Sequence, residues 1–290
     1  MYNKKYMNQV WNQKQENAKI ARAHTEDMWK KYNANIELSI QNSKIYLEDF
    51  TKDYSQDTPP GNIPAIRLIK TDTIDCIKVA RSHITTKVIE SKNPKICILN
   101  FASFKNPGGR FIDGSMAQEE AICHKTDLYN ILSDKRITDK FYTPNLKSLN
   151  KALYKNRAIY TPNVIVELDT SVKDVKQTVT VDVLTCAAPN YNAANKYQNI
   201  QRDECNEVMD SRIKYILDIM DENKVDIAIL GAFGCGVFGN DPKFVAESFQ
   251  KHIKSFDYNM VWCLFAIPGG PNFNAFKEIL TNGQTSTIYI

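Results

Sequence analysis

From residue 65 onward, hydrophobic and polar positions alternate between strand-like runs and helical periodicity. KICILNFAS (95–103) is an apolar run between turn signals, as expected of a buried strand. Residues 75–91 carry apolar side chains at helical spacing instead. The other elements that we expect are strands at 65–70, 164–168, 179–188, 225–230 and 258–267, helices at 118–132, 200–223 and 242–255, an irregular segment at 133–161, and a turn with a short helix at 268–280. This alternation predicts an α/β fold whose mostly parallel central sheet is covered by helices on both faces.

The first 56 residues are polar and helix-forming, with only intermittent apolar side chains. We expect these side chains to anchor accessory helices on the core: Val10, Trp11, Ile20, Met28, Trp29, Ile36 and Ile40. TPPGNIP (58–64) is a strong helix breaker and marks the entry into the main fold. The sequence therefore predicts a helical N-terminal extension (1–60) packed on one main domain (61–290).

Composition and charge exclude several classes of protein. The chain has 290 residues, 43% of them hydrophobic and 24% charged, with a net charge of +4 and scattered Lys and Arg, so strong nucleic-acid binding is not indicated. The longest apolar runs are too short to span a bilayer, and the N-terminus has no signal-peptide core. The seven cysteines are widely spaced without a CxxC pair, which argues against a disulfide framework or a zinc knuckle. We expect a cytoplasmic protein without membrane contact.

Two glycine-rich loops follow predicted strands, at the strand ends where open α/β sheets bind ligands. The first, NPGGR (106–110), follows strand 95–103, and the second, GAFGCGVFGN (231–240), follows strand 225–230. Glycines let backbone N–H groups approach a phosphate, and a helix that begins just afterwards favours an anion. Together the loops predict a diphosphate site, although a tight turn between strand and helix explains either loop alone.

The second loop also matches the GxGxxG fingerprint of nicotinamide-dependent dehydrogenases. That fingerprint belongs on the first strand of its domain and needs an acidic residue at the end of the next strand. Here the loop lies near the end of the chain, and the strand after it ends in FAIP (265–268) without a carboxylate. A dehydrogenase is therefore the last of the alternatives.

Gln118, Glu119 and Glu120 stand at the predicted start of a helix, shortly after the first loop. Acidic residues favour the first turn of any helix, so a solvated helix start is one interpretation. Adjacent helical residues point about 100° apart, however, so two carboxylates beside a ligand can serve different purposes. A glycoside-cleaving site needs a carboxylic acid to protonate the leaving oxygen. The helix dipole and a nearby Arg110 would lower the pKa of that acid, and a bound diphosphate would raise it.

Four segments together resemble the microbial-type poly(ADP-ribose) glycohydrolases, a branch of the macrodomain superfamily: NFAS (100–103), NPGG (106–109), QEE (118–120) and GAFGCGVFGNDP (231–242). The resemblance covers about residues 65–280, and the first sixty residues resemble the family's helical extension more loosely. It implies a three-layer α/β/α macrodomain-like fold that binds ADP-ribose. It also implies hydrolysis of O-glycosidic ribose–ribose bonds in poly(ADP-ribose), with no metal and no cofactor.

The resemblance also assigns residues. Glu120 matches the family's catalytic acid, and Glu119 matches the partner that holds ribose hydroxyls. The residues expected to bind substrate are Asn100, Asn106, Gly108, Gly109, Arg110, Gln118, Gly234, Cys235, Gly236, Val237, Phe238, Gly239, Asn240, Asp72 and Phe273. Among them, Phe238 is expected against the distal ribose and Asp72 at the adenine end. Phe273 could stack on adenine or simply pack its helix.

Arg110 departs from the pattern, because it stands where the family signature has its third glycine. If this position needs a positive φ or a close approach to the ligand, arginine costs roughly 1–3 kcal/mol there or changes the path of the loop. Its guanidinium could instead pair with a phosphate. Two alternatives to a polymer-cleaving enzyme therefore stay open: a reader module that binds ADP-ribose without cleaving it, and a hydrolase of mono-ADP-ribosylated protein or nucleic acid. The expected partners are ADP-ribose and poly(ADP-ribose) on modified proteins, with ADP-ribosylated nucleic acid second, and we expect a monomer.

Overall fold

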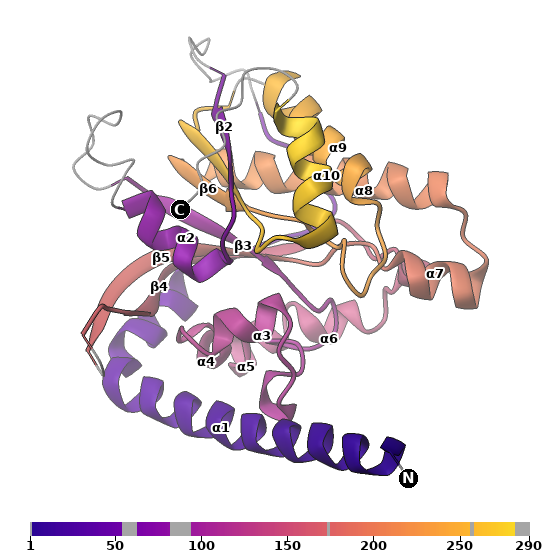
Figure 1. Cartoon of the computed structure of the whole chain (residues 1–290). Helices are drawn as coiled ribbons and strands as arrows, with labels where there is room; N and C mark the ends of the chain where they lie inside the picture. Colours follow the sequence, from indigo (N-terminus) through magenta and orange to yellow (C-terminus); the bar gives the residue numbers. More distant parts are fainter. Residues whose placement is uncertain (1, 54–62, 82–93, 173–174, 256–257, 282–290) are drawn as a thin grey trace.

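A single sheet forms the centre of the computed structural model, which describes residues 2–53, 63–81, 94–172, 175–255 and 258–281. The sheet has the strand order β1-β4-β5-β3-β6-β7-β2 (Figure 1). Its strands are β1 (Lys44–Tyr46), β2 (Ala65–Ile69), β3 (Ile96–Phe101), β4 (Ala158–Asp169), β5 (Lys176–Cys186), β6 (Ile227–Leu230) and β7 (Trp262–Ala266). Pairing is parallel from β5 through β3, β6 and β7 to β2, and antiparallel where β4 meets β1 and β5. The predicted mostly parallel sheet is confirmed.

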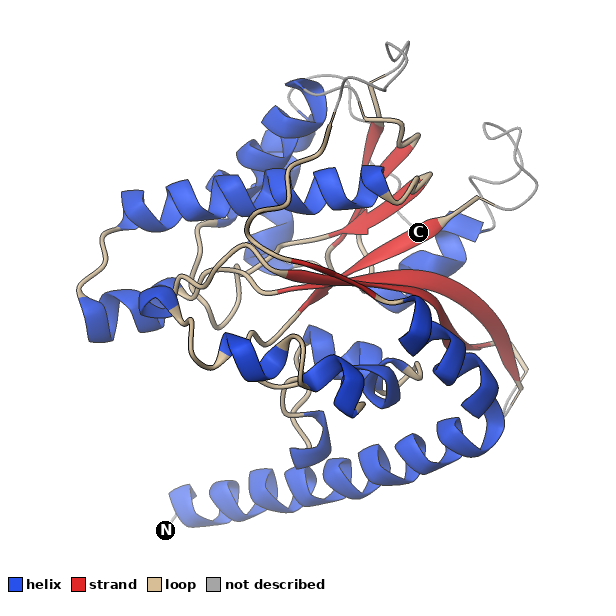
Figure 2. Ribbon diagram, turned by 180° about the vertical axis from the view of Figure 1, so that it is seen from behind, coloured by secondary structure: helices blue, strands red, loops and turns tan. Residues whose placement is uncertain are grey.

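Helices cover both faces of this sheet (Figures 1 and 2). On one face lie α8 (Arg202–Glu222), α9 (Pro242–Ser255) and α10 (Gly270–Thr281); on the other lie α1 (Tyr2–Asn42), α2 (Thr73–Val79), α3 (Gln118–Cys123), α4 (Leu128–Leu132), α5 (Lys135–Thr138) and α6 (Tyr142–Asn145). Strand β3 serves both hydrophobic cores, because successive side chains of a strand point to opposite faces. Cys97 and Leu99 belong to the core under α8 and α9, while Ile96 and Ile98 belong to the other. The three-layer fold is thus observed.

The N-terminal helix α1 runs along the outside of the α3–α5 layer and bends at Tyr32, where φ is −129° and ψ is 20° (Figure 2). Of its predicted anchors, Met28, Ile36 and Ile40 are buried, but Trp11, Ile20 and Trp29 are exposed. The prediction that all of them are core anchors is therefore wrong: the helix buries one face, to which these three side chains do not belong.

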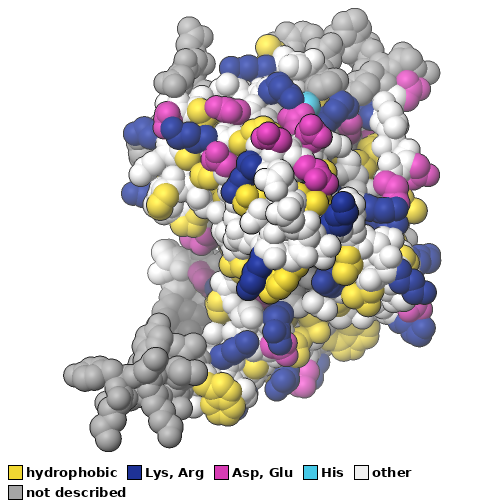
Figure 3. Space-filling model, turned by 90° about the vertical axis from the view of Figure 1, so that its right-hand side faces the viewer, with side chains coloured by type: hydrophobic (Ala, Val, Ile, Leu, Met, Phe, Trp, Pro, Cys, Tyr) yellow, Lys and Arg dark blue, Asp and Glu magenta, His cyan; other side chains and the backbone are white. Residues whose placement is uncertain are grey.

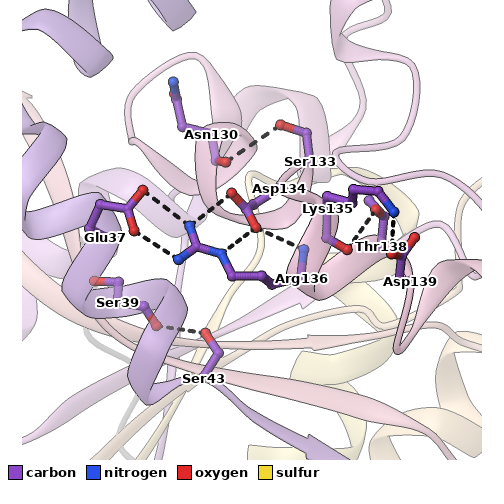
Figure 4. Close-up of polar contacts among 10 residues, drawn as sticks. All are labelled: Glu37, Ser39, Ser43, Asn130, Ser133, Asp134, Lys135, Arg136, Thr138 and Asp139. Carbon is purple, nitrogen blue, oxygen red and sulfur yellow. Dashed lines mark hydrogen bonds and ion pairs between the residues drawn. The ribbon is translucent and has the colours of Figure 1, made fainter.

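The N-terminal segment also contributes to the sheet itself, since β1 pairs with β4 along one edge. The predicted breaker at 58–64 lies mostly outside the described residues, and a boundary near residue 60 stays a prediction. Figure 4 shows how α1 is tied to the layer beneath it: the Arg136 side chain donates two hydrogen bonds to Glu37 of α1 (2.8 and 3.1 Å) and two to Asp134 at the start of α5 (2.7 and 2.9 Å).

The expected continuous helix at 118–132 is broken into α3 and α4. At the break, Thr126 forms a β-bridge with Val166 of β4, and its hydroxyl donates to Ile122 O (2.9 Å). The backbone N–H of Asp127 donates to Ile165 O. These long-range bonds to β4 outweigh the local helical periodicity, which a sequence pattern alone cannot reveal.

The segment expected to be irregular (133–161) contains α5, α6, a 3-10 turn η4 (Asn150–Ala152) and the beginning of β4. Strand β4 is twelve residues long because it continues through Pro162 and Asn163, where the register with β5 shifts at a bulge. A helix not expected, α7 (Tyr191–Gln198), follows β5. The predicted helix at 75–91 is observed as α2, and its remainder, from residue 82 on, lies outside the described residues.

The scattered Lys and Arg of the sequence predict a surface on which charges of both signs are mixed. Figure 3 shows basic and acidic side chains interspersed on one face of the molecule. Within the described ranges, no helix has the length and apolar content needed to cross a bilayer.

Candidate active site

The two glycine loops meet because the strands that precede them are neighbours. β3 and β6 pair in parallel, with Cys97 opposite Ala228, so the loops after both strands leave the same edge of the sheet (Figure 1). The loop after β7 lies beside them, since β7 pairs with β6. A cavity of about 660 Å³ opens at this edge. This is the position at which parallel α/β sheets bind ligands.

Gly108 and Gly109 both have a φ of +62°, the left-handed region that favours glycine. A Cβ at Gly108 would lie 2.6 Å from the ring of Tyr129. A Cβ at Gly109 would lie 2.5 Å from Glu120 Oε1 and 2.9 Å from Glu119 Oε2. The glycine loop therefore packs directly on the two carboxylates, which explains why both features occur together.

Glu119 is almost fully buried, with 3% of its surface exposed. Its Oε2 accepts the backbone N–H of Ser103 (2.7 Å), and its Oε1 accepts the Nδ2 of Asn100 (3.2 Å). Burial raises the pKa of Glu119 to about 8, against the opposing effect of these two hydrogen bonds. Burial thus favours the protonated, neutral form of this carboxyl group.

Glu120 differs from its neighbour in how its oxygens are bound. It is 6% exposed, and Oε1 accepts the backbone N–H of Arg110 (2.9 Å). Its Oε2 is buried and has no hydrogen-bond partner among the described residues. One oxygen is thus held by the first loop, while the other is left without a hydrogen bond within the described structure. The two carboxylates have different environments, as their positions in the sequence led us to expect, and a solvated helix start is wrong for both.

Arg110 occupies an ordinary conformation, with φ of −117° and ψ of 35°. Its side chain is 67% exposed and pairs with Asp113 at 3.0 Å. The concern that arginine is strained in place of the third glycine is therefore wrong, because this position does not need a positive φ. Its guanidinium donates to Asp113, and its backbone N–H donates to Glu120.

The polar residues around the first loop support its conformation. Gln118 joins β3 to α2: its Oε1 accepts Phe101 N (2.8 Å), and its Nε2 donates to Thr73 Oγ1 (3.1 Å) and Leu99 O (2.9 Å). Asn100 is fully buried beneath Glu119. Asn106 is exposed, and its backbone oxygen accepts Gly109 N at 3.1 Å. Asn100 and Gln118 therefore hold protein groups, whereas Asn106 turns the loop.

The second loop is shaped by two left-handed glycines. Gly234 has a φ of +73°, and Gly239 has +71°. Asn240 is buried and ties the loop down, since its Nδ2 donates to Pro189 O (2.8 Å) and Gly234 O (3.0 Å). Gly236 lines the cavity, and a Cβ there would meet nothing within 4 Å. The loop thus presents open backbone to the cavity at Gly236.

The side chains of this loop take different positions. Val237 is 83% exposed, while Cys235 and Phe238 are half-buried. Cys235 packs on the core, and burial raises the pKa of its thiol to about 12, so it stays protonated. Phe238 contacts the ring of Tyr154 at 6.5 Å between centroids. None of these three residues lines the cavity, which this loop borders only at Ala232 and Gly236.

The chain resembles a known protein family. The model of the microbial-type PARG catalytic domain matches residues 14–169, more than half of the chain. The chain belongs to the microbial-type PARG family. The match begins inside α1, so most of that helix lies within the matched domain. No curated protein sequence matches the chain.

Solved structures of bacterial PARGs share the fold. The poly(ADP-ribose) glycohydrolase of Thermomonospora curvata is 25% identical, with a TM-score of 0.75 over 91% of this chain and 99% of that one. Its complex with the inhibitor ADP-HPD is 24% identical, with a TM-score of 0.72 over the same shares of the two chains. The Deinococcus radiodurans PARG in complex with ADP-ribose is 25% identical, with a TM-score of 0.71 over 85% of this chain and 97% of that one.

The remaining residues expected from the PARG resemblance divide between cavity and core. Asp72 lines the cavity and caps α2, where its carboxylate accepts Asp75 N at 2.8 Å. Phe273 is 5% exposed and packs in the core under α10, which favours helix packing over adenine stacking. Its neighbour Asn272 lines the cavity instead.

Several lining residues were missed by sequence reasoning. They include Thr73 and Ile74 of α2, Phe101 at the end of β3, Ala232, and the stretch from Ala266, the last residue of β7, to Gly269. The signal for the last group was present: PGG (268–270) directly follows the last strand, at the carboxyl end where ligands bind. The sequence pattern predicts only a turn there. Glu119 and Glu120 are buried and are not among the lining residues, although Gln118 and Ala121, which flank them in α3, are.

The raised pKa of Glu119 predicts a pH-dependent stability. The folded protein holds this proton up to about pH 8, whereas an unfolded chain releases it near pH 4.5, so stability falls as pH rises through this window. We expect Glu119→Gln to make that fall shallower, as measured by Tm between pH 4.5 and 9 in matched buffers. The part that remains comes from Asp127, whose pKa burial raises to about 7. Glu247→Gln, at an exposed position of α9, is the control and should keep the wild-type slope. Parallel curves for wild type and Glu119→Gln would contradict the assignment.

Proposed function

We propose that this protein is a poly(ADP-ribose) glycohydrolase that hydrolyses O-glycosidic ribose–ribose bonds and releases ADP-ribose. Membership of the PARG family supports this activity. The observation that carries the proposed chemistry is the Glu120 carboxylate: Oε1 is held by Arg110 N, while Oε2 is buried and without a partner among the described residues. A buried oxygen that is free to bind a ligand suits a group that must give and take a proton.

Glu120 acts as the general acid in this proposal. Its carboxyl proton passes to the leaving ribose oxygen as the bond from that oxygen to the anomeric carbon breaks, which leaves an oxocarbenium-like ribose. A water held near the diphosphate attacks the anomeric carbon and returns a proton to Glu120.

The other groups bind and orient the substrate. The left-handed glycines of both loops bring backbone N–H groups toward a diphosphate. Asp72 and the residues after β7 form the wall of the cavity at its proposed adenine end. Glu119 accepts two protein hydrogen bonds and retains lone pairs for a ribose hydroxyl. The Deinococcus relative was solved with ADP-ribose bound, which is consistent with this ligand for the present chain.

Arg110 no longer favours a non-catalytic reader module. Its conformation is unstrained, and its side chain pairs with Asp113. Both catalytic-loop glycines and both carboxylates are present and packed together. A mono-ADP-ribosyl hydrolase is not favoured by any contact described above, so polymer cleavage is the function that we propose.

Two measurements on the wild-type protein test the function. Calorimetry should show that ADP-ribose binds with micromolar affinity or better. Incubation with poly(ADP-ribosyl)ated protein should release ADP-ribose, detected by chromatography. Binding without release would leave the reader module as the function, and absence of binding heat would exclude both.

A further inference from the structure

The segment just before β4 has an unusual backbone. Asn150, Lys151, Ala152 and Tyr154 have φ values of 43°, 51°, 66° and 62°. Left-handed backbone is unfavourable for residues that carry a Cβ, and a bulky residue such as tyrosine is rarely found there. Such conformations persist where surrounding contacts impose them, and they occur preferentially at functional sites. We therefore asked what these contacts hold in place.

The ring of Tyr154 contacts one aromatic residue just before the first glycine loop and another within the second. It stacks on Phe104, which lies between β3 and the first loop, with 4.6 Å between centroids and 10° between planes. It also contacts Phe238 of the second loop at 6.5 Å and 59°. Both distances lie within the range in which aromatic pairs attract. Tyr154 is 7% exposed and is not part of the cavity lining in the described structure, so it acts on the loops rather than on a ligand.

Arg212 of α8 holds the backbone of this segment. Its guanidinium is fully buried and donates from Nη2 to Tyr154 O (3.2 Å) and Leu153 O (3.5 Å). It also donates from Nε to Asn156 Oδ1 (2.6 Å) and from Nη1 to Ala187 O. All four acceptors are neutral oxygens, and a buried charge is costly unless hydrogen bonds compensate for it. The side chain therefore joins α8, the end of β5 and the left-handed segment into one unit.

We propose that Tyr154 is a positioning residue that keeps the two glycine loops in a fixed position relative to one another. Arg212 holds Tyr154 in the conformation that this requires. The inference rests on the proposed function, because the loops are taken to enclose the diphosphate and distal ribose of one substrate. If the ring of Tyr154 is removed, Phe104 and Phe238 lose their common neighbour. The loops can then shift relative to one another, and both ligand affinity and turnover fall while the sheet stays intact.

The test compares Tyr154→Ala with Tyr154→Phe, which keeps the ring and loses only the hydroxyl bonded to Asn190. Small displacements in a site cost large factors, so Tyr154→Ala should raise the Kd for ADP-ribose about tenfold and lower kcat/KM for polymer at least as much. Tyr154→Phe should stay within about twofold of wild type, as for an isolated neutral hydrogen bond. Calorimetry and initial rates are measured well below the Tm of each variant, with circular dichroism as the check of folding.

Phe104→Ala removes the same stack from the other side and keeps the inference testable if Tyr154→Ala does not fold. It should act in the same direction, and the double variant should lose less than the product of the two single losses, because both delete one contact. Arg212→Lys keeps the charge but not the fork of donors, and should weaken binding like Tyr154→Ala. If folded Arg212→Lys binds ADP-ribose with the wild-type Kd, the role proposed for Arg212 is wrong.

The outcomes distinguish failure of the positioning role from failure of the proposed function. A merely structural role would lower Tm in Tyr154→Ala and Phe104→Ala but leave Kd and kcat/KM at their wild-type values, and that result overturns the positioning role. If the wild-type protein binds and cleaves while these variants equal it, the inference alone fails. If the wild-type protein neither binds nor cleaves, the proposed function fails first.

Discussion

Glu120→Gln is expected to abolish release of ADP-ribose from poly(ADP-ribose) while ADP-ribose still binds with nearly wild-type affinity. The amide keeps an oxygen that can accept the N–H of Arg110, now 2.9 Å from Oε1, so the first loop can keep its position. It cannot supply the acidic proton, and loss of a general acid typically costs about 10²- to 10⁴-fold in rate. Initial rates on polymer and calorimetry with ADP-ribose measure the two effects separately.

The control for this variant is Glu247→Gln, an exposed glutamate of α9, which should leave both quantities unchanged. Release by Glu120→Gln at the wild-type rate would remove Glu120 from the role of acid. In that case Glu119, whose pKa is raised to about 8, would be the next carboxyl group to test. Loss of binding together with release would instead mean that the carboxylate mainly holds the loop.

Gly109→Ala is expected to have the second largest effect, because it forces a methyl group against the carboxylates. The new Cβ would lie 2.5 Å from Glu120 Oε1 and 2.9 Å from Glu119 Oε2, far inside contact distance. The φ of +62° adds roughly 1–2 kcal/mol for a residue with a Cβ. Displacing catalytic groups by about 1 Å costs about a hundredfold, so kcat/KM for polymer should fall by at least that factor.

Arg110→Gly is the matched control, since it changes the neighbouring residue of the same loop. Arg110 has a φ of −117° and an exposed side chain paired with Asp113, so its removal should change turnover by no more than about twofold, as for an ordinary surface substitution. A marked rise in turnover would mean that the arginine obstructs the site, and a marked fall that it contacts substrate. Near-wild-type turnover in Gly109→Ala would contradict the packing of the loop on the carboxylates.

Much of the fold could be predicted because its signals are local. The apolar run of β3, the periodicity of α9 and the glycines after β3 and β6 all reflect burial or backbone geometry within a few residues. The alternation of strands and helices then restricts the sheet to mostly parallel pairing. The break between α3 and α4 was not predictable in this way, because it depends on the bridge between Thr126 and Val166, forty residues further along the chain.

The candidate site likewise has some features that the sequence predicts and others that depend on tertiary contacts. The pairing of a glycine loop with two adjacent glutamates was evident from the sequence, and so was its resemblance to PARGs. The conformation of Arg110 was not, because φ at that position depends on how the loop closes over Glu120 and Asp113. Phe273 was misleading for a similar reason: an aromatic residue at helical spacing fits a core or a ligand equally well, and only its burial decides.

By itself, the sequence determined the types of group at the site and the strands that carry them, since motif spacing and apolar periodicity act over a few residues. Tertiary structure alone decided which groups are buried, which oxygens are already bound and which conformations are strained. Glu119 owes its raised pKa to burial, and Tyr154 reaches both loops only because β3 and β6 are neighbours and Arg212 lies beneath it. These properties depend on contacts between residues far apart in the chain, which no local pattern encodes.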